Sequence, residues 1–333
     1  MFLVDLKGRD SIGNIDDLAT KYFSDPRRFA SVFEFAFKDK GLKITPNNLQ
    51  PLDPREIIVG TKQVGNQTRA SATKTVRDIM KMLTVGDEGI VFHMMLGLEE
   101  QSYVDYRMPV RVANYDLRRY WEQLIDRMLE LDRLSDAHEI SLKGSEFFSK
   151  FLKTDRIVPV VTVVLYLGSD PWDGPRTLHD MFDIQNPDYL SLVNDYDIHL
   201  IDPHDMSSEE LANLPEDLSA LFDTVASAAD KERARNAFSK DARYHKVDTA
   251  TAEMISALLG ISLPKNEEGV TDVDNGFLQV IREEVNEGRA KVCEEILATY
   301  GDKLPPEVAE GILAMAHGER PQSADAPQAV TRS

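Results

Sequence analysis

The run IVPVVTVVLYL at 157–167 constrains the fold more than any other stretch of the chain. Nearly every residue in it is apolar, most are β-branched, and the polar alternation of a half-exposed strand is missing. Such a run is typical of a strand that is buried on both faces, so we expect it to be central in a sheet. With 333 residues, 42% of them apolar, the chain is long enough for one large or two ordinary domains.

The segments on either side predict a mixed α/β core. Residues 16–40 have a helical pattern interrupted by Ser-Asp-Pro, and residues 196–205 contain another short strand. Residues 41–70 are rich in Pro, Asn, Gly and Thr, which indicates a loop with one short strand at 57–60.

A long helix is expected over 105–135, where apolar residues recur every three or four positions. The predicted apolar stripe consists of Val110, Ala113, Leu117, Tyr120, Leu124, Met128 and Leu131.

Two strand-like runs around the turn sequence GDEG predict a β-hairpin over 77–101. Pairing across the turn places Val85 near Ile90. The same register brings Asp78, at the start of the first strand, within a residue or two of Glu99, near the end of the second.

The end of this hairpin carries the sequence GLEEQS at 97–102. Side chains alternate along a strand, so Glu99 and Gln101 share one face and Glu100 takes the other. Two carboxylates placed like Asp78 and Glu99 can share a hard divalent cation, which takes oxygen ligands and retains waters. The alternative is that these are solvated polar positions at a strand end.

A metal in this position suits phosphodiester hydrolysis, because it neutralises the phosphate and lowers the pKa of a bound water. Gln101 can orient a water or a scissile oxygen by hydrogen bonding, but it supplies neither a charge nor a base.

These residues resemble the PD-(D/E)xK nuclease superfamily and, more narrowly, the Rpn family of recombination-promoting nucleases, also described as putative transposases. The resemblance rests on RD at 77–78, LEEQS at 98–102, MPVRVANYDLRRY at 108–120, IVPVVTVVLYLGSDPWDGPRTLHDMF at 157–182 and YDIHLID at 196–202. It runs from about residue 15 to 262. Glu100 is a departure, because the family often has Asn or His before the Gln.

The resemblance implies a restriction-endonuclease-like fold and Mg²⁺- or Mn²⁺-dependent DNA cleavage, linked to recombination, mobile DNA or defence. Asp78 and Glu99 would be the metal ligands, the backbone carbonyl of Glu100 a further ligand, and Gln101 the third motif residue.

The DNA would be held mainly through its backbone, by basic residues that flank the hairpin. The candidates are Lys74, Arg77, Lys81, Arg107, Arg111, Arg118 and Arg119. Tyr115, Lys21 and Glu34 are weaker supporting candidates, for which packing or ordinary surface charge is the alternative.

The C-terminal part differs in character from the core. After about residue 208 the pattern is helical throughout. We therefore expect a nuclease-like α/β domain over 15–205, a helical region over 206–317 and a disordered tail over 318–333.

Charge separates the two parts of the chain. Residues 1–130 contain 19 Lys and Arg and 19 Asp and Glu, so the net charge of −19 comes from the rest. The first part could meet DNA along a local basic face, whereas the acidic helices suit a protein partner or a second copy.

One cysteine, Cys293, excludes a disulfide scaffold and fits a reducing compartment. The charged N-terminus is unlike a signal peptide and no apolar run is long enough for a membrane span, so we expect a cytoplasmic protein without a membrane partner.

Two other functions stay open at this point. The chain could be a catalytically inactive DNA-docking or protein-interaction module that kept the fold. Gln101 in the third motif position, Glu100 beside it and the net charge of −19 all argue against nuclease activity. An assembly adaptor that uses the acidic helices is compatible with either function.

Overall fold

The computed structural model describes residues 10–64, 67–76, 78–87, 90–184, 186–228, 242–245, 247–260, 270–271, 290–299 and 306–316. The tail that the sequence predicts to be disordered, 318–333, lies outside these residues. Among the helices of the described part, none has the length and apolar character needed to cross a membrane.

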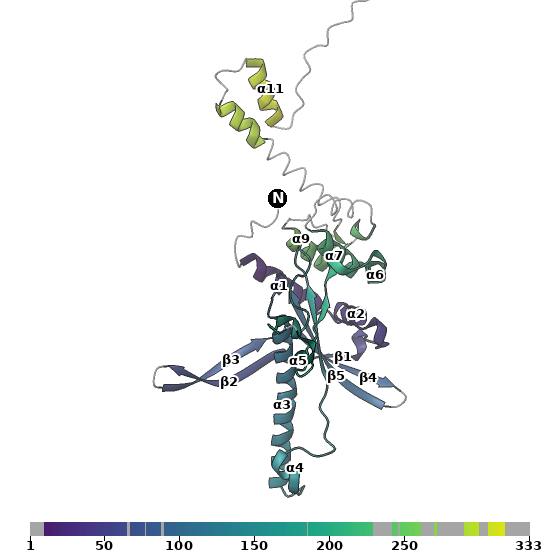
Figure 1. Ribbon diagram of the computed structural model, residues 1–333. Coiled ribbons are helices and arrows are strands. Elements are labelled where there is room, and N and C mark those ends of the chain that lie inside the picture. The colour runs from purple at the N-terminus through teal and green to yellow at the C-terminus, as the bar shows by residue number, and fades with distance from the viewer. Residues whose placement is uncertain are drawn as a thin grey trace, which may run out of the picture.

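The fold is built on a five-stranded mixed sheet with the strand order β1-β4-β5-β6-β7 (Figure 1). Its strands are β1 (Leu49–Pro51), β4 (Ile79–Asp87), β5 (Ile90–Gln101), β6 (Val160–Tyr166) and β7 (His199–Ile201). Neighbours β1, β4 and β5 are antiparallel, whereas β5, β6 and β7 are parallel. The predicted mixed α/β core is therefore confirmed.

Strand β6 is the predicted buried strand. Val163 and Leu165 join a large hydrophobic cluster on one face of the sheet, and Val164 and Tyr166 join a smaller cluster on the other. The strand lies between β5 and β7, while β5 occupies the middle of the sheet.

Two helices precede the sheet, α1 (Asp10–Phe23) and α2 (Pro26–Ala36). The predicted interruption is confirmed and has a local cause. The Asp25 side chain accepts the backbone N–H of Arg27, and Pro26 occupies the first turn of α2, where its missing N–H costs nothing.

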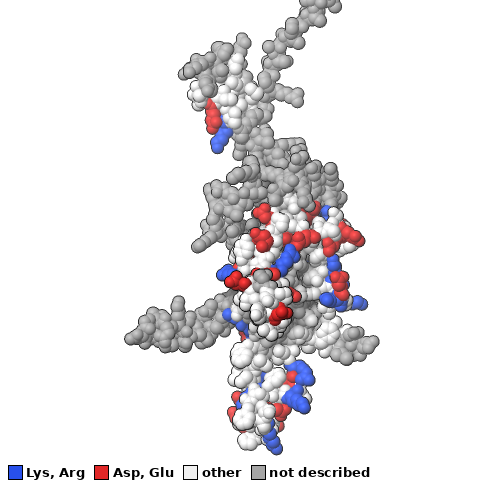
Figure 2. All heavy atoms as spheres, in the orientation of Figure 1, with Lys and Arg blue, Asp and Glu red and all other residues white. Residues whose placement is uncertain are grey.

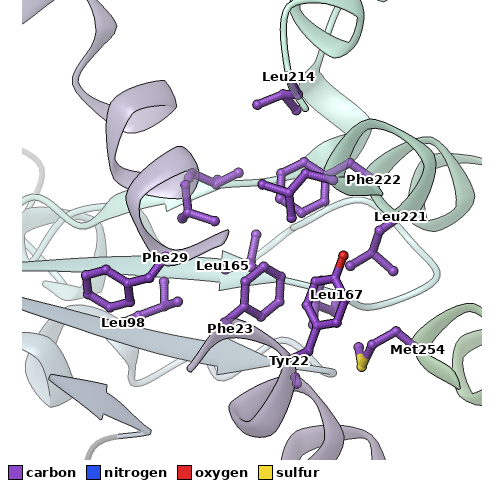
Figure 3. Close-up of a cluster of buried hydrophobic side chains, with 14 of the residues drawn as sticks. Tyr22, Phe23, Phe29, Leu98, Leu165, Leu167, Leu214, Leu221, Phe222 and Met254 are labelled. Carbon is purple, nitrogen blue, oxygen red and sulfur yellow. The ribbon is translucent and has the colours of Figure 1, made fainter. Parts of the chain in front are cut away.

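The large cluster joins these helices to the C-terminal helices α7 (Glu216–Ser227) and α9 (Thr249–Leu259). Figure 3 shows Phe23, Leu165 and Phe222 gathered in this cluster between the sheet and the helices. Residues from both sides of position 205 thus share one core. The division at 205 stays a prediction.

Polar contacts reinforce the same junction. The buried Arg28 of α2 forms ion pairs with Asp217 of α7 at 3.0 Å and with Asp248, the N-cap of α9, at 2.9 Å. Its guanidinium also lies 3.9 Å from the ring centroid of Tyr22, whose hydroxyl hydrogen-bonds Thr251 at 3.0 Å.

The long helix α3 (Met108–Asp136) and the short α4 (Gly144–Ser149) connect β5 to its parallel neighbour β6. The buried Asp116 fixes α3 to the sheet side, because Thr162 donates to its Oδ1 at 2.6 Å and the Tyr196 hydroxyl donates to its Oδ2. Beyond this contact α3 extends away from the sheet, with α4 at its far end (Figure 1).

The structure corrects the predicted buried face of α3. Leu117 is 62% exposed, and Val110 and Met128 are exposed as well, whereas Leu131 is buried as expected. The buried residues of the helix are Met108, Pro109, Val112, Tyr115, Asp116 and Leu131.

The predicted loop at 41–70 is the second correction. Residues 55–76 form strands β2 (Arg55–Val64) and β3 (Gln67–Val76), which pair only with each other in an antiparallel hairpin within the described part. Figure 1 shows this hairpin projecting away from the main sheet.

The C-terminal portion is helical, apart from a two-stranded pair of β8 (Val247–Asp248) and β9 (Val270–Thr271) that the sequence did not predict. The other helices are α5 (Pro187–Leu190), α6 (Ser208–Ala212), a helix over 290–299 and α11 (Pro306–Ala316). Short 3₁₀ turns lie at Lys38–Lys40, Pro46–Asn48, His179–Met181, Pro203–Asp205 and Ala242–His245.

Candidate functional site

The predicted site lies where β4 begins and β5 ends. The hairpin is confirmed, with Ile79 opposite Leu98 and Asp87 opposite Ile90. The predicted register was shifted by two residues, since Val85 pairs with Phe92 rather than Ile90. Asp78 directly precedes β4, and its Oδ2 accepts the backbone N–H of Glu100 at 2.9 Å.

Glu99 and Gln101 both point to α3, in agreement with strand alternation. Arg111, in the first turn of α3, donates from Nη2 to Oε2 of Glu99 at 3.1 Å and from Nη1 to Oε1 of Gln101 at 3.2 Å. The Gln101 amide also donates to the carbonyl of Glu100 at 2.9 Å. The carbonyl that was expected to bind a metal therefore accepts a hydrogen bond here.

Arg111 lies at the centre of a cluster of polar side chains that hydrogen-bond it. It also donates to Oδ2 of Asp105 at 2.8 Å and to the Tyr115 hydroxyl at 3.3 Å. Asp105 and Glu99 are both almost fully buried, and Arg111 pairs with both, while Arg107 also pairs with Asp105.

The pKa shifts follow from this geometry. Burial lowers the pKa of Arg111, but its bonds to Tyr115, Glu99 and Asp105 outweigh burial and raise it. Burial raises the pKa of Asp105, whereas its bonds to Arg107 and Arg111 lower it well below the usual value. Both shifts favour the charged forms, so the cluster is a set of ion pairs at neutral pH.

Glu100 points to the opposite face of β5 and is 1% exposed. Its carboxyl oxygens accept no N–H or O–H donor in the described structure, but the Asp78 carboxyl lies within hydrogen-bonding reach when one of the two acids carries a proton. Burial, and next the charge of Asp78, raise the pKa of Glu100 well above its usual value.

Asp78 shares this environment. Burial raises its pKa, the hydrogen bond from Glu100 opposes that effect, and the charge of Asp16 on α1 adds to it. Burial also raises the pKa of Asp16 itself. Glu99 and Asp105 bond Arg111 directly, whereas Asp78 and Glu100 adjoin each other near Asp16. The charge of Arg111 also lowers the pKa of Asp78 and of Asp16, so the two groups of acids interact.

The sequence analysis missed Asp16 and Asp105. Asp16 stands three and seven positions before Ala19 and Phe23, two buried residues of α1, so its place on the inner face could have been inferred. Asp105 precedes the helix, and its Oδ1 accepts the backbone N–H of Arg107 at 3.0 Å, a local bond typical of Asp at a helix start.

The candidate DNA-binding residues are scattered. Lys81 is buried and donates to the carbonyl of Ser24 at 3.0 Å, which leaves it no route to a phosphate. Lys74 lies in β3, but its side chain is not described, and Arg77 lies outside the described residues.

Three arginines of the candidate set have partners within α3 or next to it. Arg107 is 74% exposed and paired with Asp105 at 2.9 Å. Arg118 donates to Asn114 at 3.0 Å, and Arg119 bonds Glu122 at 2.8 Å. In Figure 2 the basic and acidic side chains on the displayed face are interspersed.

The supporting candidates fall into two classes. Tyr115 belongs to the site through Arg111, and it is buried. Lys21 and Glu34 are exposed residues of α1 and α2, outside the contacts described above.

Fold and site together define a mixed α/β protein with a five-stranded mixed sheet, a helical C-terminal portion and an acidic strand end. Comparison of the chain with protein-family models, with curated proteins and with solved structures finds no match.

Proposed function

We propose that this protein is a metal-dependent DNA endonuclease of the PD-(D/E)xK type, related to the Rpn family. One observation carries the proposal: Asp78 and the Glu-Glu-Gln segment lie together, joined by the hydrogen bond from Glu100 N–H to Asp78. Residues 22 positions apart thus bring several carboxyl oxygens and an amide to one strand end.

The donor set fits a hard divalent cation such as Mg²⁺ or Mn²⁺. The supporting observation is the buried carboxyl of Glu100, which accepts no N–H or O–H donor in the described structure and adjoins the carboxyl of Asp78. When bound, the cation would neutralise the phosphate and supply an acidified water as nucleophile.

The assignment of Glu99 as a metal ligand stays a prediction, and the structure attaches a condition to it. Glu99 is already paired with Arg111, so a cation would compete with the guanidinium for Oε2. The Glu100 carbonyl would likewise have to release the Gln101 amide.

The residues of this chain have separable tasks in the proposed reaction. Gln101 would orient the phosphate or the attacking water through its amide, once it is released from the Glu100 carbonyl. Arg111 adjoins both Glu99 and Gln101 and would hold a phosphate oxygen by charge-assisted hydrogen bonds.

Plasmid nicking with Mg²⁺ or Mn²⁺ tests this function. We expect nicking that stops with EDTA and is lost in the Asp78→Ala variant. Purified protein that does not nick supercoiled, linear or single-stranded DNA in either metal would refute the proposal.

A second candidate function is a catalytically inactive module that docks DNA or a protein. The ion pairs that occupy Glu99 and Asp105 favour it, because they neutralise the site without a metal. The exposed apolar residues of α3, among them Leu117 and Trp121, also suit a protein partner. DNA binding without nicking, whose affinity falls steeply with salt, would support this alternative.

A further inference from the structure

Helix α3 has an exposed apolar face along the part that extends away from the sheet (Figure 1). Leu117 and Trp121, in the middle of this face, are 62% and 61% exposed. The exposed apolar residues recur at helical spacing, and they are Val110, Leu117, Trp121, Ile125, Met128 and Leu129. Single exposed apolar residues are common, whereas a continuous row of them indicates an interaction surface. We call this row the apolar face of α3.

A different face of α3 contacts the chain that returns from α4 to β6. The Gln123 amide donates to the carbonyl of Val158 at 3.0 Å. Arg127 forms an ion pair with Asp155 at 2.8 Å. The helix is thus held in place beyond the sheet, while its apolar face stays exposed in the described structure.

The charges of α3 are divided along its length. Residues 105–119, at its beginning, contain four Arg and two Asp, whereas residues 122–136 contain two Arg and five Asp and Glu. The net charges are therefore +2 and −3, and the helix dipole has the same sign as the side chains at each end. The same helix of a second copy is complementary in charge only if it runs in the opposite direction. The acidic half would repel DNA and anionic lipids, so the charges favour a second copy over either.

Exposed aromatic residues lie at both ends of the apolar face. Tyr106, four positions before Val110, is 58% exposed. At the other end Lys150 pairs with Asp132 at 2.7 Å, and its Nζ lies 4.6 Å from the ring centroid of Phe147. These contacts hold α4 against the end of α3, where Phe147 is 49% exposed. An antiparallel pair of helices brings the two aromatic ends together, whereas a parallel pair keeps them apart.

We propose that α3 pairs with the same helix of a second copy of this chain, in an antiparallel arrangement with Trp121 near the two-fold axis. Leu117 of one copy then lies opposite Ile125 of the other. The exposed Arg107 comes beside the exposed Asp136 of the second copy. The inference does not depend on the proposed nuclease activity, because it uses none of the acids at the strand end.

Sedimentation velocity of the full chain over a range of protein concentrations tests the inference. One helix pair buries a small interface, so we expect a dimer of twice 37.5 kDa with a dissociation constant on the order of 10 µM. Trp121→Glu should weaken the dimer at least about a hundredfold, because a symmetric contact contains the change twice. Leu117→Glu should repeat the loss.

Leu192→Glu is the matched control. It places the same charge on an 81% exposed leucine outside α3 and α4, and it should change the affinity by less than about threefold. Well below the dissociation constant the chain is a monomer, so thermal melting followed by circular dichroism at that concentration shows whether each variant is folded. We expect the three variants to melt like wild type there, because all three side chains are exposed in the single copy.

Disulfide crosslinking in a Cys293→Ser background tests the orientation. Leu117→Cys mixed with Ile125→Cys should form a disulfide between the two different chains. Leu117→Cys alone should form none, because two copies of position 117 lie about 12 Å apart along an antiparallel pair. Self-crosslinking of Leu117→Cys would show a parallel pair and overturn the inference.

A dimer that survives Trp121→Glu would place the interface elsewhere, such as on the acidic C-terminal helices, and would also overturn it. The same holds for a wild-type chain that stays monomeric tenfold above the expected dissociation constant. Acrylamide quenching then shows what occupies the face, because Trp172 is 7% exposed and Trp121 is the accessible tryptophan. A protected Trp121 in a monomer would mean that another part of this chain covers it, and an accessible one would leave the face to a different protein.

Discussion

Arg111 and Glu99 are joined by an ion pair of 3.1 Å between Nη2 and Oε2, across the gap between α3 and β5. The same guanidinium binds Asp105 at 2.8 Å, and both carboxylates are almost fully buried. This relationship links the first turn of α3 to the strand end that carries the candidate site, so it should contribute to stability.

Removing the guanidinium should be strongly destabilising. Arg111→Ala leaves the buried Glu99 without its cation and leaves Asp105 with Arg107 alone, so we expect the free energy of unfolding to fall by about 3–5 kcal/mol in urea denaturation. Arg107→Ala is the matched control, because it removes an exposed arginine from the same Asp105 and should cost about 1 kcal/mol or less. Equal losses in the two variants would contradict the central role of Arg111.

Arg28 should hold the C-terminal helices to the core. Its ion pairs reach Asp217 and Asp248, whose side chains are partly exposed, so Arg28→Ala should cost about 1–3 kcal/mol. The neighbouring Arg27→Ala removes an exposed arginine that pairs only locally with Asp25, and it should change stability by less than about 0.5 kcal/mol.

The same pair of variants tests whether the core is shared. If α7 and α9 unfold together with the sheet, circular dichroism and intrinsic fluorescence will report one coincident transition for Arg28→Ala. Two separated transitions would show that the region after residue 205 is an independent unit.

Two leucines of α3 test the face that the helix buries. Leu131 is 1% exposed, so Leu131→Ala should lower the free energy of unfolding by about 2–5 kcal/mol. Leu117 is exposed, and Leu117→Ala should stay within about 0.5 kcal/mol of wild type. If chemical denaturation shows a larger loss for Leu117→Ala than for Leu131→Ala, the helix buries the apolar stripe expected from the sequence instead.

The pair of His204 and Asp202 should make stability depend on pH. Burial lowers the pKa of His204, but the 2.7 Å contact with Asp202 outweighs burial and raises the pKa from its usual 6.5. A raised pKa means that the folded protein binds the proton more tightly than the unfolded chain. The contribution is therefore complete below the usual pKa and is lost as the pH rises through the folded value.

The measurement is the difference in unfolding free energy between wild type and His204→Gln. We expect this difference to shrink between about pH 6 and pH 8, and to lose its pH dependence in the Asp202→Asn background. A difference that stays constant over this range would show that the imidazole does not change its charge there.

The sequence predicted correctly the strands that appear as clear runs of apolar residues. The β-branched run at 157–167 became β6, and the two apolar runs around GDEG became the β4–β5 hairpin. The site residues Asp78, Glu99 and Gln101 could be placed at one strand end because strand alternation and hairpin geometry depend only on local order.

The β2–β3 hairpin was missed because its strands are rich in Thr, Lys and Gln and lack an alternating apolar face. The dipeptide Gly65-Asn66 between the two strands was the available signal, since such pairs favour tight hairpin turns.

Which charged side chains pair with one another could not be predicted from the sequence. That Arg111 pairs with Glu99 depends on how α3 packs on the sheet, and that Asp16 approaches Asp78 depends on how α1 packs. The prediction that the apolar stripe of α3 is buried was wrong for a related reason. Periodicity identifies an apolar face of a helix but not whether another element covers it.

The hydrogen bond between Tyr22 and Thr251 joins residues 229 positions apart, and this separation has a consequence for folding during protein synthesis. Translation at 5–20 residues per second separates the appearance of these two residues by about 10–50 s. During that interval the inner faces of α1 and α2, including Phe23, Phe29 and Phe33, lack the helices that cover them in the finished protein. The newly made N-terminal half must therefore be shielded from aggregation until residue 251 and the rest of α9 have emerged.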